Sequence, residues 1–250
     1  MIDFHTHVLP GIDDGSSDLT MSAGMIREEC SQGTRVIVAT PHFYADRMSI
    51  DRFLARRDEA FEQVEAWRRE ESALADTAAD GMEMPQILTG AEVYYFQGMG
   101  RAKALPDLCV SGTDTILLEM PFAQWDKGVL RDVEDILHRQ KLTIVLAHIE
   151  RYIEFQKDKS VWEEIFDLPV IPQINAGSFR KRGGLFRRDH RRKFCLHFLE
   201  EHPRLILGSD AHNLTSRPPN LKAGREEIAS ALGEDALHRI DETTREVLGL

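Results

Sequence analysis

Several features that define large classes of protein are missing from this sequence. The 250 residues include only three cysteines, Cys30, Cys109 and Cys195, which are widely spaced and form no C-x-x-C pair, so we expect neither a disulfide framework nor a zinc knuckle. No uninterrupted apolar run approaches the roughly 18 residues that a transmembrane helix needs. The N-terminus has neither the basic nor the long apolar region of a signal peptide. We therefore expect a cytoplasmic protein that does not insert into membranes.

An excess of positive charge is also missing. The chain has 31 Lys and Arg against 42 Asp and Glu, a formal net charge of -11, which argues against a nucleic-acid partner. The segment Phe179–Lys193 is an exception, with eight Lys or Arg and one Asp. It is either a solvated helix face with its preceding loop or a docking surface for an acidic, phosphorylated protein tail.

Apolar, β-branched runs alternate with charged stretches of helical periodicity, which predicts a parallel α/β fold. Strands are expected at Ile2–Phe4, Arg35–Thr40, Gln86–Tyr94, Thr115–Met120, Leu142–Ala147, Val170–Asn175 and Leu205–Ser209. Helices are expected at Asp18–Gln32, Ile50–Ser72, Lys127–Gln140 and Arg188–Glu201, and one or two more over Asn220–Leu250 with a break at Gly233. We expect Ala75–Pro85 to be a loop. No nucleotide-binding glycine motif follows any strand, which favours a single-domain barrel over an open nucleotide-binding sheet.

Most of the predicted strands end in a side chain that can bind a metal ion. The C-terminal strand ends are where parallel barrels build their sites. The residues at these positions, or in the loops that follow, are His5, His7, Asp13, Asp14, His42, Glu92, Glu119, His148, Asp210 and His212. His5 and His7 are two residues apart, so a strand would point both to the same side. Nine ligands, with either Asp13 or Asp14 among them, are too many for one ion.

We therefore expect two or three divalent ions, with Mn²⁺, Fe²⁺ or Zn²⁺ fitting a mixed set of imidazole and carboxylate ligands. Closely spaced metals lower the pKa of a bridging water and stabilise both oxygens of a phosphoryl transfer, so phosphoester hydrolysis by a metal-activated hydroxide is the expected chemistry. A thiol route is rejected, because the segment from Cys30 to Arg35 is one residue short of the phosphate loop that cysteine phosphatases need. A serine triad is poorly supported as well, because the sequence contains no G-x-S-x-G motif.

Six motifs carry a family resemblance: MIDFHTHVLPGIDDG, ATPH, GAEVYY, LLEM, LAHIERY and SDAHNLTSRPP, in this order. They resemble the polymerase-and-histidinol-phosphatase (PHP) superfamily, and within it the bacterial protein-tyrosine phosphatases of capsule and exopolysaccharide systems. The resemblance covers most of the chain, from Met1 to about Asn220. It implies a single domain over residues 1–250, folded as a distorted (βα)₇ barrel with three metal ions, often manganese.

The resemblance also implies roles for single residues. The first metal would be held by His5, His7, Glu92 and Asp210, the second by Glu92, Glu119 and His148, and the third by Asp14, His42 and His212. Asp13 remains a rival to Asp14. Arg151 and Arg217, in loops that leave the metal face, would clamp phosphate, because a guanidinium matches phosphate oxygens in pairs. Asp14 could also protonate the leaving group if it is not fully occupied as a ligand.

The expected substrate follows from the same resemblance. It is phosphotyrosine in a protein, with a tyrosine autokinase of polysaccharide export as the expected partner. All four tyrosines, Tyr44, Tyr94, Tyr95 and Tyr152, lie within four residues of a proposed ligand. These rings either pack the barrel rim or, with Phe43 and Phe96, flank an aromatic phosphoester. A small-molecule phosphatase, such as one for histidinol phosphate, is the alternative, and a PHP nuclease is a more remote one.

Overall fold

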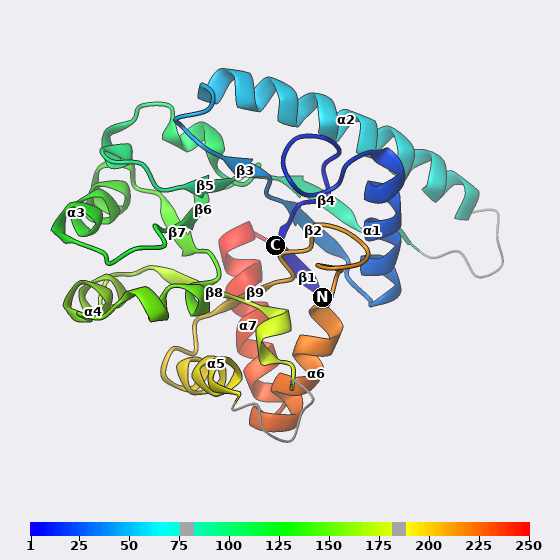
Figure 1. Cartoon of the computed structure of the whole chain (residues 1–250). Helices are drawn as coiled ribbons and strands as arrows, with labels where there is room; N and C mark the ends of the chain where they lie inside the picture. The colour runs from blue at the N-terminus through cyan, green and yellow to red at the C-terminus, as the bar shows by residue number, and fades with distance from the viewer. Residues whose placement is uncertain (76–82, 182–188) are drawn as a thin grey trace.

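In the computed structural model, the parts of the chain that are described are residues 1–75, 83–181 and 189–250. Most of the predicted loop Ala75–Pro85, and residues 182–188 of the basic segment, therefore lie outside the described residues. The strands lie in the interior and the helices surround them (Figure 1).

The strands form one curled set of parallel pairs. In chain order they are β1 (Ile2–Thr6), β2 (Val36–Ala39), β3 (His42–Phe43), β4 (Gln86–Thr89), β5 (Glu92–Tyr94), β6 (Thr115–Glu119), β7 (Thr143–Leu146), β8 (Ile171–Asn175) and β9 (Ile206–Gly208). One sheet has the order β1-β2-β4 and the other β3-β5-β6-β7-β8-β9, with every pairing parallel. The α/β class with a parallel sheet is confirmed.

The strand predicted at Arg35–Thr40 is confirmed as β2, and a short strand that was not predicted, β3, follows it, whereas the prediction of one uninterrupted strand over Gln86–Tyr94 was wrong. The chain leaves the ladder at Thr40 and Pro41 and again at Gly90 and Ala91. Proline has no N–H for the ladder, but its carbonyl accepts a hydrogen bond from the Glu92 N–H at 3.0 Å, which carries the pairing across the gap. The two breaks place His42 and Glu92 side by side in the β3–β5 register.

Seven α-helices are described. They are α1 (Leu19–Ser31), α2 (Ile50–Ala75), α3 (Lys127–Asp135), α4 (Ser160–Phe166), α5 (His190–Glu201), α6 (Leu221–Leu232) and α7 (Glu234–Leu248). Asp18 caps α1 by accepting the Met21 N–H at 2.9 Å. The predicted break at Gly233 is confirmed, and its φ of 82° is one that glycine adopts without strain. The sequence missed α4, and the stretch predicted as one helix to Gln140 ends in a wider π-helical turn over Ile136–Gln140.

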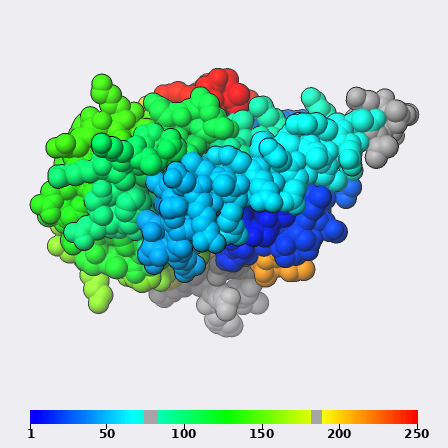
Figure 2. Space-filling model, turned by 90° about the horizontal axis from the view of Figure 1, so that it is seen from above, coloured from blue at the N-terminus to red at the C-terminus, as the bar shows by residue number. Residues whose placement is uncertain are grey.

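Short 3₁₀ turns lie between these elements. They are η1 (Met99–Arg101), η2 (Leu105–Leu108), η4 (Ile149–Arg151), η5 (Ile153–Phe155) and η6 (Ala176–Phe179). Helix α2 lies along one side of the molecule (Figure 1), and its residues fill the middle and the right of the face seen in Figure 2. No helix in the described ranges is both long and apolar enough to cross a membrane.

The inside of the curl is a small apolar core of its own. Phe4, Val38, Leu117, Val145 and Ile206 are buried together there, one from each of five strands, with two residues from the end of α7, Val247 and Leu248. Helix α7 also packs on β1 and β9. This packing fills the end of the curl opposite to the C-terminal strand ends. The polar residues at the C-terminal strand ends therefore lie on the other side of this apolar core.

Candidate metal centre

The predicted ligands gather at the C-terminal ends of the strands. The N–H of Asp210 donates to the His5 carbonyl at 2.8 Å and the N–H of His7 to the Ala211 carbonyl at 2.9 Å, which brings the segment after β9 against β1. Gly208 permits this approach, because a Cβ there would lie 2.5 Å from the Cβ of His5. Seven of the nine predicted ligands are buried: His5, His7, Glu92, Glu119, His148, Asp210 and His212. The side chains of His42 and Asp14 are 13% and 69% exposed.

Glu92 is the centre of this cluster. Its Oε2 lies 3.1 Å from Nε2 of His5, 3.3 Å from Nε2 of His7 and 2.9 Å from Nδ1 of His42. Its Oε1 lies 2.7 Å from Nε2 of His148. One carboxylate therefore faces four imidazoles contributed by β1, β3 and the segments that follow β1 and β7.

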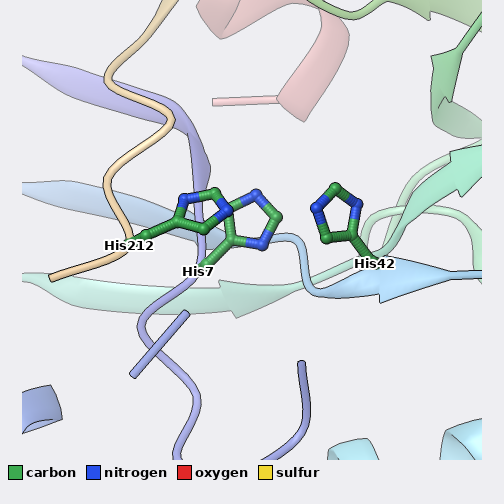
Figure 3. A group of neighbouring side chains, drawn as sticks. All are labelled: His7, His42 and His212. Atoms are coloured by element: carbon green, nitrogen blue, oxygen red, sulfur yellow. The ribbon is translucent and has the colours of Figure 1, made fainter. Parts of the chain in front are cut away.

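A second set of side chains surrounds His7. Oδ1 of Asp210 lies 3.4 Å from Nε2 of His7 and 3.5 Å from Nδ1 of His212. Oδ1 of Asp14 lies 3.4 Å from Nε2 of His42 and 3.6 Å from Nε2 of His212. Figure 3 shows the rings of His7 and His212 close together, with His42 facing them from β3.

Ligand atoms close enough to share an ion occur in three overlapping groups among the described residues. They are His5, His7 and Asp210; His42, Glu92 and Glu119; and His7, His42 and His212. The first group lies within the set predicted for the first metal, but the other two combine members of different sets, since His42 lies with Glu92 and Glu119 as well as with His7 and His212. The assignment of each residue to one ion therefore stays a prediction.

The donor atoms fit divalent cations. Buried nitrogen and oxygen atoms are normally hydrogen-bonded, yet Nδ1 of His42, Oε2 of Glu92, Oε2 of Glu119 and Nε2 of His212 make no hydrogen bond. Nδ1 of His42 and Oε2 of Glu92 approach each other to 2.9 Å without the geometry of a hydrogen bond. Nε2 of His5 and Nε2 of His7 face each other at 3.1 Å, although at least one would have to carry a proton to bond the other. Cations between these atoms would satisfy all of them, and imidazole with carboxylate suits Mn²⁺, Fe²⁺ or Zn²⁺.

The electrostatics point the same way. Burial raises the pKa of Glu119 to about 7, and the neighbouring charge of Glu92 adds to this effect. Burial opposes ionisation of Glu92 as well, but the surrounding histidines hold its pKa well below the usual range. Burial and the nearby His7 lower the pKa of His212 to about 3. Burial lowers the pKa values of His5 and His7, but the carboxylates around them, among them Glu92 and Asp210, raise both above the usual value. The buried carboxylates of the centre are therefore stable only with positive charge beside them, from protonated imidazoles or from bound cations.

The structure separates the two adjacent aspartates that the sequence could not distinguish. Asp13 is buried against His7, with Oδ2 2.7 Å from Nδ1 of that ring, and it also accepts the backbone N–H groups of His42 at 2.9 Å and Gly15 at 2.9 Å. Asp14 makes none of these contacts and faces His42 and His212 from the solvent side. Asp13 therefore orients a ring, while Asp14 has a carboxylate oxygen directed at the cluster.

Two residues of the cluster hold unusual backbone conformations. His148 has φ 29° and Asp210 has φ 55°, both in the region that non-glycine residues rarely adopt. Such conformations cost about 1 to 3 kcal/mol each and persist where the surrounding structure enforces them, often at functional sites.

The two predicted phosphate-binding arginines meet at the same carboxylate. Oδ2 of Asp210 lies 2.7 Å from Nη2 of Arg217 and 3.4 Å from Nη1 of Arg151. Each of these arginine side chains is 37% exposed, so both guanidinium groups are accessible next to the metal centre. Arg151 also lies over the ring of Phe122, with Cζ 5.6 Å from the ring centroid.

Sequence reasoning missed two amides of β8, the one strand to which it assigned no ligand. Oε1 of Gln173 accepts the Nδ1–H of His5 at 3.1 Å and the backbone N–H of His148 at 2.8 Å. Its Nε2 donates to Oδ1 of Asn175 at 3.0 Å, and Nδ2 of Asn175 donates to Oδ2 of Asp210 at 2.8 Å. The sequence did contain a signal for this role, because β8 carries amides where the other strands carry ligands. Such an amide is a candidate for holding those ligands in place.

The aromatic side chains near the ligands divide into two kinds. Tyr152 and Phe43 are buried in the main core, and Tyr152 accepts the Met120 N–H at 3.0 Å, so the packing interpretation holds for these two. Tyr44, Tyr94, Tyr95 and Phe96 are half-buried and line a hollow beside Glu119.

Two other sequence predictions concern the cysteines and the basic segment. All three cysteines are buried as free thiols, and burial raises the pKa of the Cys109 thiol to about 12, far from a reactive thiolate. In the described part of the basic segment, Lys181 and Arg192 lie 3.6 Å and 3.2 Å from Oε2 of Glu227. Its role as a docking surface or a solvated face stays open.

The chain is similar to known proteins over nearly its whole length. Residues 1–247 match the protein family described as capsular polysaccharide synthesis, CpsB/CapC. The chain is 32% identical over 246 residues to the tyrosine-protein phosphatase CpsB of Streptococcus agalactiae serotype III, covering 96% of this chain and 94% of that protein. It is 28% identical over 222 residues to the tyrosine-protein phosphatase YwqE of Bacillus subtilis, covering 87% and 79%.

A solved structure is similar as well. It comes from work on YwqE of Bacillus subtilis and CpsB of Streptococcus pneumoniae, described as unique metal-dependent tyrosine phosphatases, and it matches with a TM-score of 0.81 and 26% identity over 100% of this chain and 94% of that chain. The resemblance inferred from the sequence motifs is confirmed. The chain belongs to the CpsB/CapC family of capsular polysaccharide synthesis proteins.

Proposed function

We propose that this protein is a metal-dependent protein-tyrosine phosphatase. The observation that carries the proposal is the placement of Arg151 and Arg217 beside a buried cluster of imidazoles and carboxylates whose donor atoms lack partners. A phosphate dianion needs both kinds of group, since guanidinium binds its outer oxygens and cations offset its charge. The family relatives that are named tyrosine-protein phosphatases support the same reaction.

The ions would be held by His5, His7, Asp14, His42, Glu92, Glu119, His148, Asp210 and His212, as two or three divalent ions with Mn²⁺ first among them. When bound, they supply Lewis-acid charge and lower the pKa of a water molecule toward neutrality.

The residues of the chain bind and orient the phosphoester. Arg151 and Arg217 bind the non-bridging phosphate oxygens, and Asp210 keeps both guanidinium groups at the edge of the centre. Asp14 has the most exposed carboxyl group of the set, so it is the candidate that hands a proton to the departing phenolate oxygen. The half-buried rings near Glu119 exclude water from one side of the substrate.

The finer features of the fold belong to the same proposal. With each broken run counted once, β1, β2–β3, β4–β5, β6, β7, β8 and β9 make seven strands, and the hydrogen bonds between the segment after β9 and β1 support a distorted (βα)₇ barrel. We propose one domain over residues 1–250. A cytoplasmic location and a tyrosine autokinase of polysaccharide export as the partner fit the family to which the chain belongs.

Metal removal tests the proposal. The chain is dialysed against a chelator, and hydrolysis of a phosphotyrosyl peptide is compared before and after Mn²⁺, Fe²⁺ or Zn²⁺ is restored, with metal content measured by elemental analysis. We expect two or three ions per chain, activity that disappears with them, and a clear preference for the peptide over histidinol phosphate. Activity that persists in thoroughly metal-free protein would contradict the mechanism, and a preference for histidinol phosphate would contradict the substrate.

A further inference from the structure

A hollow lies beside the predicted metal ligands. It has a volume of about 530 Å³, and its lining includes five aromatic rings and one predicted metal ligand: Tyr44, Tyr94, Tyr95, Phe96, Phe122 and Glu119. Oε2 of Glu119 lies 3.8 Å from Nδ1 of His42, and its Oε1 lies 3.5 Å from Nε2 of His148. The hollow is therefore aromatic on its walls and opens directly onto the predicted metal ligands.

Tyr44 and Tyr94 form one side of the hollow. Their ring centroids are 5.5 Å apart at a tilt of 44°, and the ring of Tyr44 is 5.3 Å from that of His42. The guanidinium carbon of Arg47 lies 4.3 Å from the centroid of Tyr44, so the outer face of this ring is covered. These contacts fix Tyr44 between solvent and the cluster.

Phe122 also lines the hollow and connects it to the phosphate-binding residues. Its ring is stacked with that of His148 at 6.1 Å and an interplanar angle of 23°, and it packs on Tyr152 at 5.2 Å. Arg151 lies over the same ring. Phe122 is nevertheless 37% exposed, which is unusual for a side chain with three such neighbours and leaves part of its surface free for a ligand.

On the basis of the proposed function, we propose that this hollow is the binding site for the aromatic ring of the substrate and that Phe122 determines the preference for aryl over alkyl phosphoesters. A phosphate bound by Arg151 has Phe122 directly beneath the guanidinium, so a phenyl group attached to that phosphate meets the Phe122 ring. An aromatic wall gains energy from an aromatic ligand through offset or edge contacts that an alkyl chain cannot reproduce. Phosphoserine would leave the rings of the hollow in contact with water.

Two consequences of replacing Phe122 must be separated in the test. Loss of the ring removes a wall of the hollow, and it also removes the cation–π support of Arg151. The first effect weakens only ligands that carry an aromatic ring. The second weakens every ligand that carries the anion, so a pair of ligands with the same anion distinguishes them.

The experiment measures binding of phenylphosphonate and methylphosphonate to the metal-loaded full chain by calorimetry. These phosphonates share the anion and are not hydrolysed. We expect the wild type to bind phenylphosphonate about tenfold more tightly. Phe122→Leu and, independently, Tyr94→Leu should bring this ratio to about twofold or less, with methylphosphonate affinity changed by less than about twofold. Phe155→Leu is the control, because Phe155 contacts Phe122 at 6.0 Å and is 40% exposed but does not line the hollow.

The outcomes separate this inference from the function on which it rests. If neither phosphonate binds the wild type, the anion site and the proposed function both fail. If both bind but the wild-type ratio is close to one, or if Phe122→Leu weakens both ligands equally, the ring-binding role of the hollow is wrong while the phosphatase proposal stands. A ratio that falls equally in Phe155→Leu would also overturn the assignment to this hollow.

Discussion

Nδ1 of His7 lies 2.7 Å from Oδ2 of Asp13, and both side chains are buried. The carboxylate accepts the Nδ1–H of the ring, and the other nitrogen, Nε2, faces Glu92 and Asp210. This is the arrangement in which a histidine binds a metal most strongly, with its second nitrogen hydrogen-bonded to a carboxylate. With no cation bound, His7 carries a proton on both nitrogens, and its charge together with three hydrogen bonds holds the pKa of Asp13 below its usual range against the effect of burial. A bound cation would take the place of the proton on Nε2.

Asp13→Asn tests this orientation. An amide can offer its N–H₂ group to His7, which disfavours the tautomer that points Nε2 at the centre. We expect the affinity for Mn²⁺ to fall by about 10- to 100-fold, as measured by calorimetric titration of the metal-free chain. Asp46→Asn is the control, since Asp46 is exposed near the site and carries the same charge. Unchanged Mn²⁺ affinity in Asp13→Asn would show that the aspartate does not act through the ring.

The sequence alone does not determine whether Asp13 or Asp14 reaches the centre. The sequence predicts that a carboxylate after β1 reaches the centre, because the loop follows the strand that carries His5 and His7. It cannot say which of two adjacent residues does so, because a loop has no periodicity that fixes the direction of a side chain. In the structure a Cβ on Gly15 would lie 2.4 Å from that of His7, so the loop passes close to β1 and directs Asp13 inward. The assignment of Asp14 as the ligand stays a prediction.

Arg217 gives a second prediction. Its guanidinium is 2.7 Å from Oδ2 of Asp210 and remains 37% exposed, so it is positioned but still free to bind an anion. Arg217→Lys keeps the charge but loses the paired hydrogen bonds to phosphate. We expect kcat/KM on a phosphotyrosyl peptide to fall by about 100-fold, which corresponds to about 2.7 kcal/mol, with unchanged metal content.

The control for Arg217 is Arg204→Lys, which alters an exposed arginine paired with Glu246 on the surface. It should keep wild-type kcat/KM. If Arg217→Lys loses bound metal together with activity, its role is to hold Asp210 rather than phosphate. Elemental analysis of the same samples decides between the two.

Gln173 gives a third prediction, for the strand without a predicted ligand. Gln173→Met has a similar shape but neither accepts the Nδ1–H of His5 nor donates to Asn175. We expect at least a tenfold loss of Mn²⁺ affinity, while Gln173→Glu, which keeps the acceptor, should retain more of it. Gln140→Met removes an amide that bonds only the Gly100 and Ala102 carbonyls and should bind Mn²⁺ normally. Equal Mn²⁺ affinities in Gln173→Met and the wild type would contradict this role.

The strand pattern was predictable because buried parallel strands are continuous apolar runs. Apolar and β-branched residues located all seven runs, including the ends that carry His148 and Asp210. The short strand β3 and the break at Gly90 were not predictable in the same way, because they depend on the pairing of β2 with β4 and of β3 with β5. The role of Gln173 was missed because a neutral amide is common on strands, and its contacts with His5 and His148 depend on how distant segments come together.

The last prediction concerns two carboxyl groups buried away from solvent. Oδ2 of Asp3 and Oε1 of Glu29 are buried without any donor, and the two side chains interact with each other. Oδ1 of Asp3 accepts the Ser209 N–H at 2.8 Å and the His5 N–H at 3.2 Å, which favours its charged form. Burial, and then the charge of Asp3, raise the pKa of Glu29 well above its usual value, so Glu29 holds the proton that joins the pair.

A raised pKa in the folded state means that the folded chain binds this proton more tightly than the unfolded chain does. The stabilisation is complete below the unfolded pKa of about 4.3 and is lost as the pH rises through the folded pKa. Glu29→Gln supplies a permanent donor and does not titrate. We therefore expect its free energy of unfolding to match that of the wild type near pH 4.5 and to exceed it progressively toward pH 8, by up to about 1.4 kcal/mol per pH unit.

Urea unfolding of both proteins across this range, in the same metal-free buffer, measures the difference. Glu59→Gln is the matched control, because Glu59 is an exposed glutamate on α2 and its substitution should leave the pH dependence unchanged. A difference between Glu29→Gln and the wild type that is constant with pH would mean that Glu29 is ionised in the folded state. Glu29 and Asp3 would then be two ionised carboxylates side by side, and a positive charge near them would be needed to offset their repulsion.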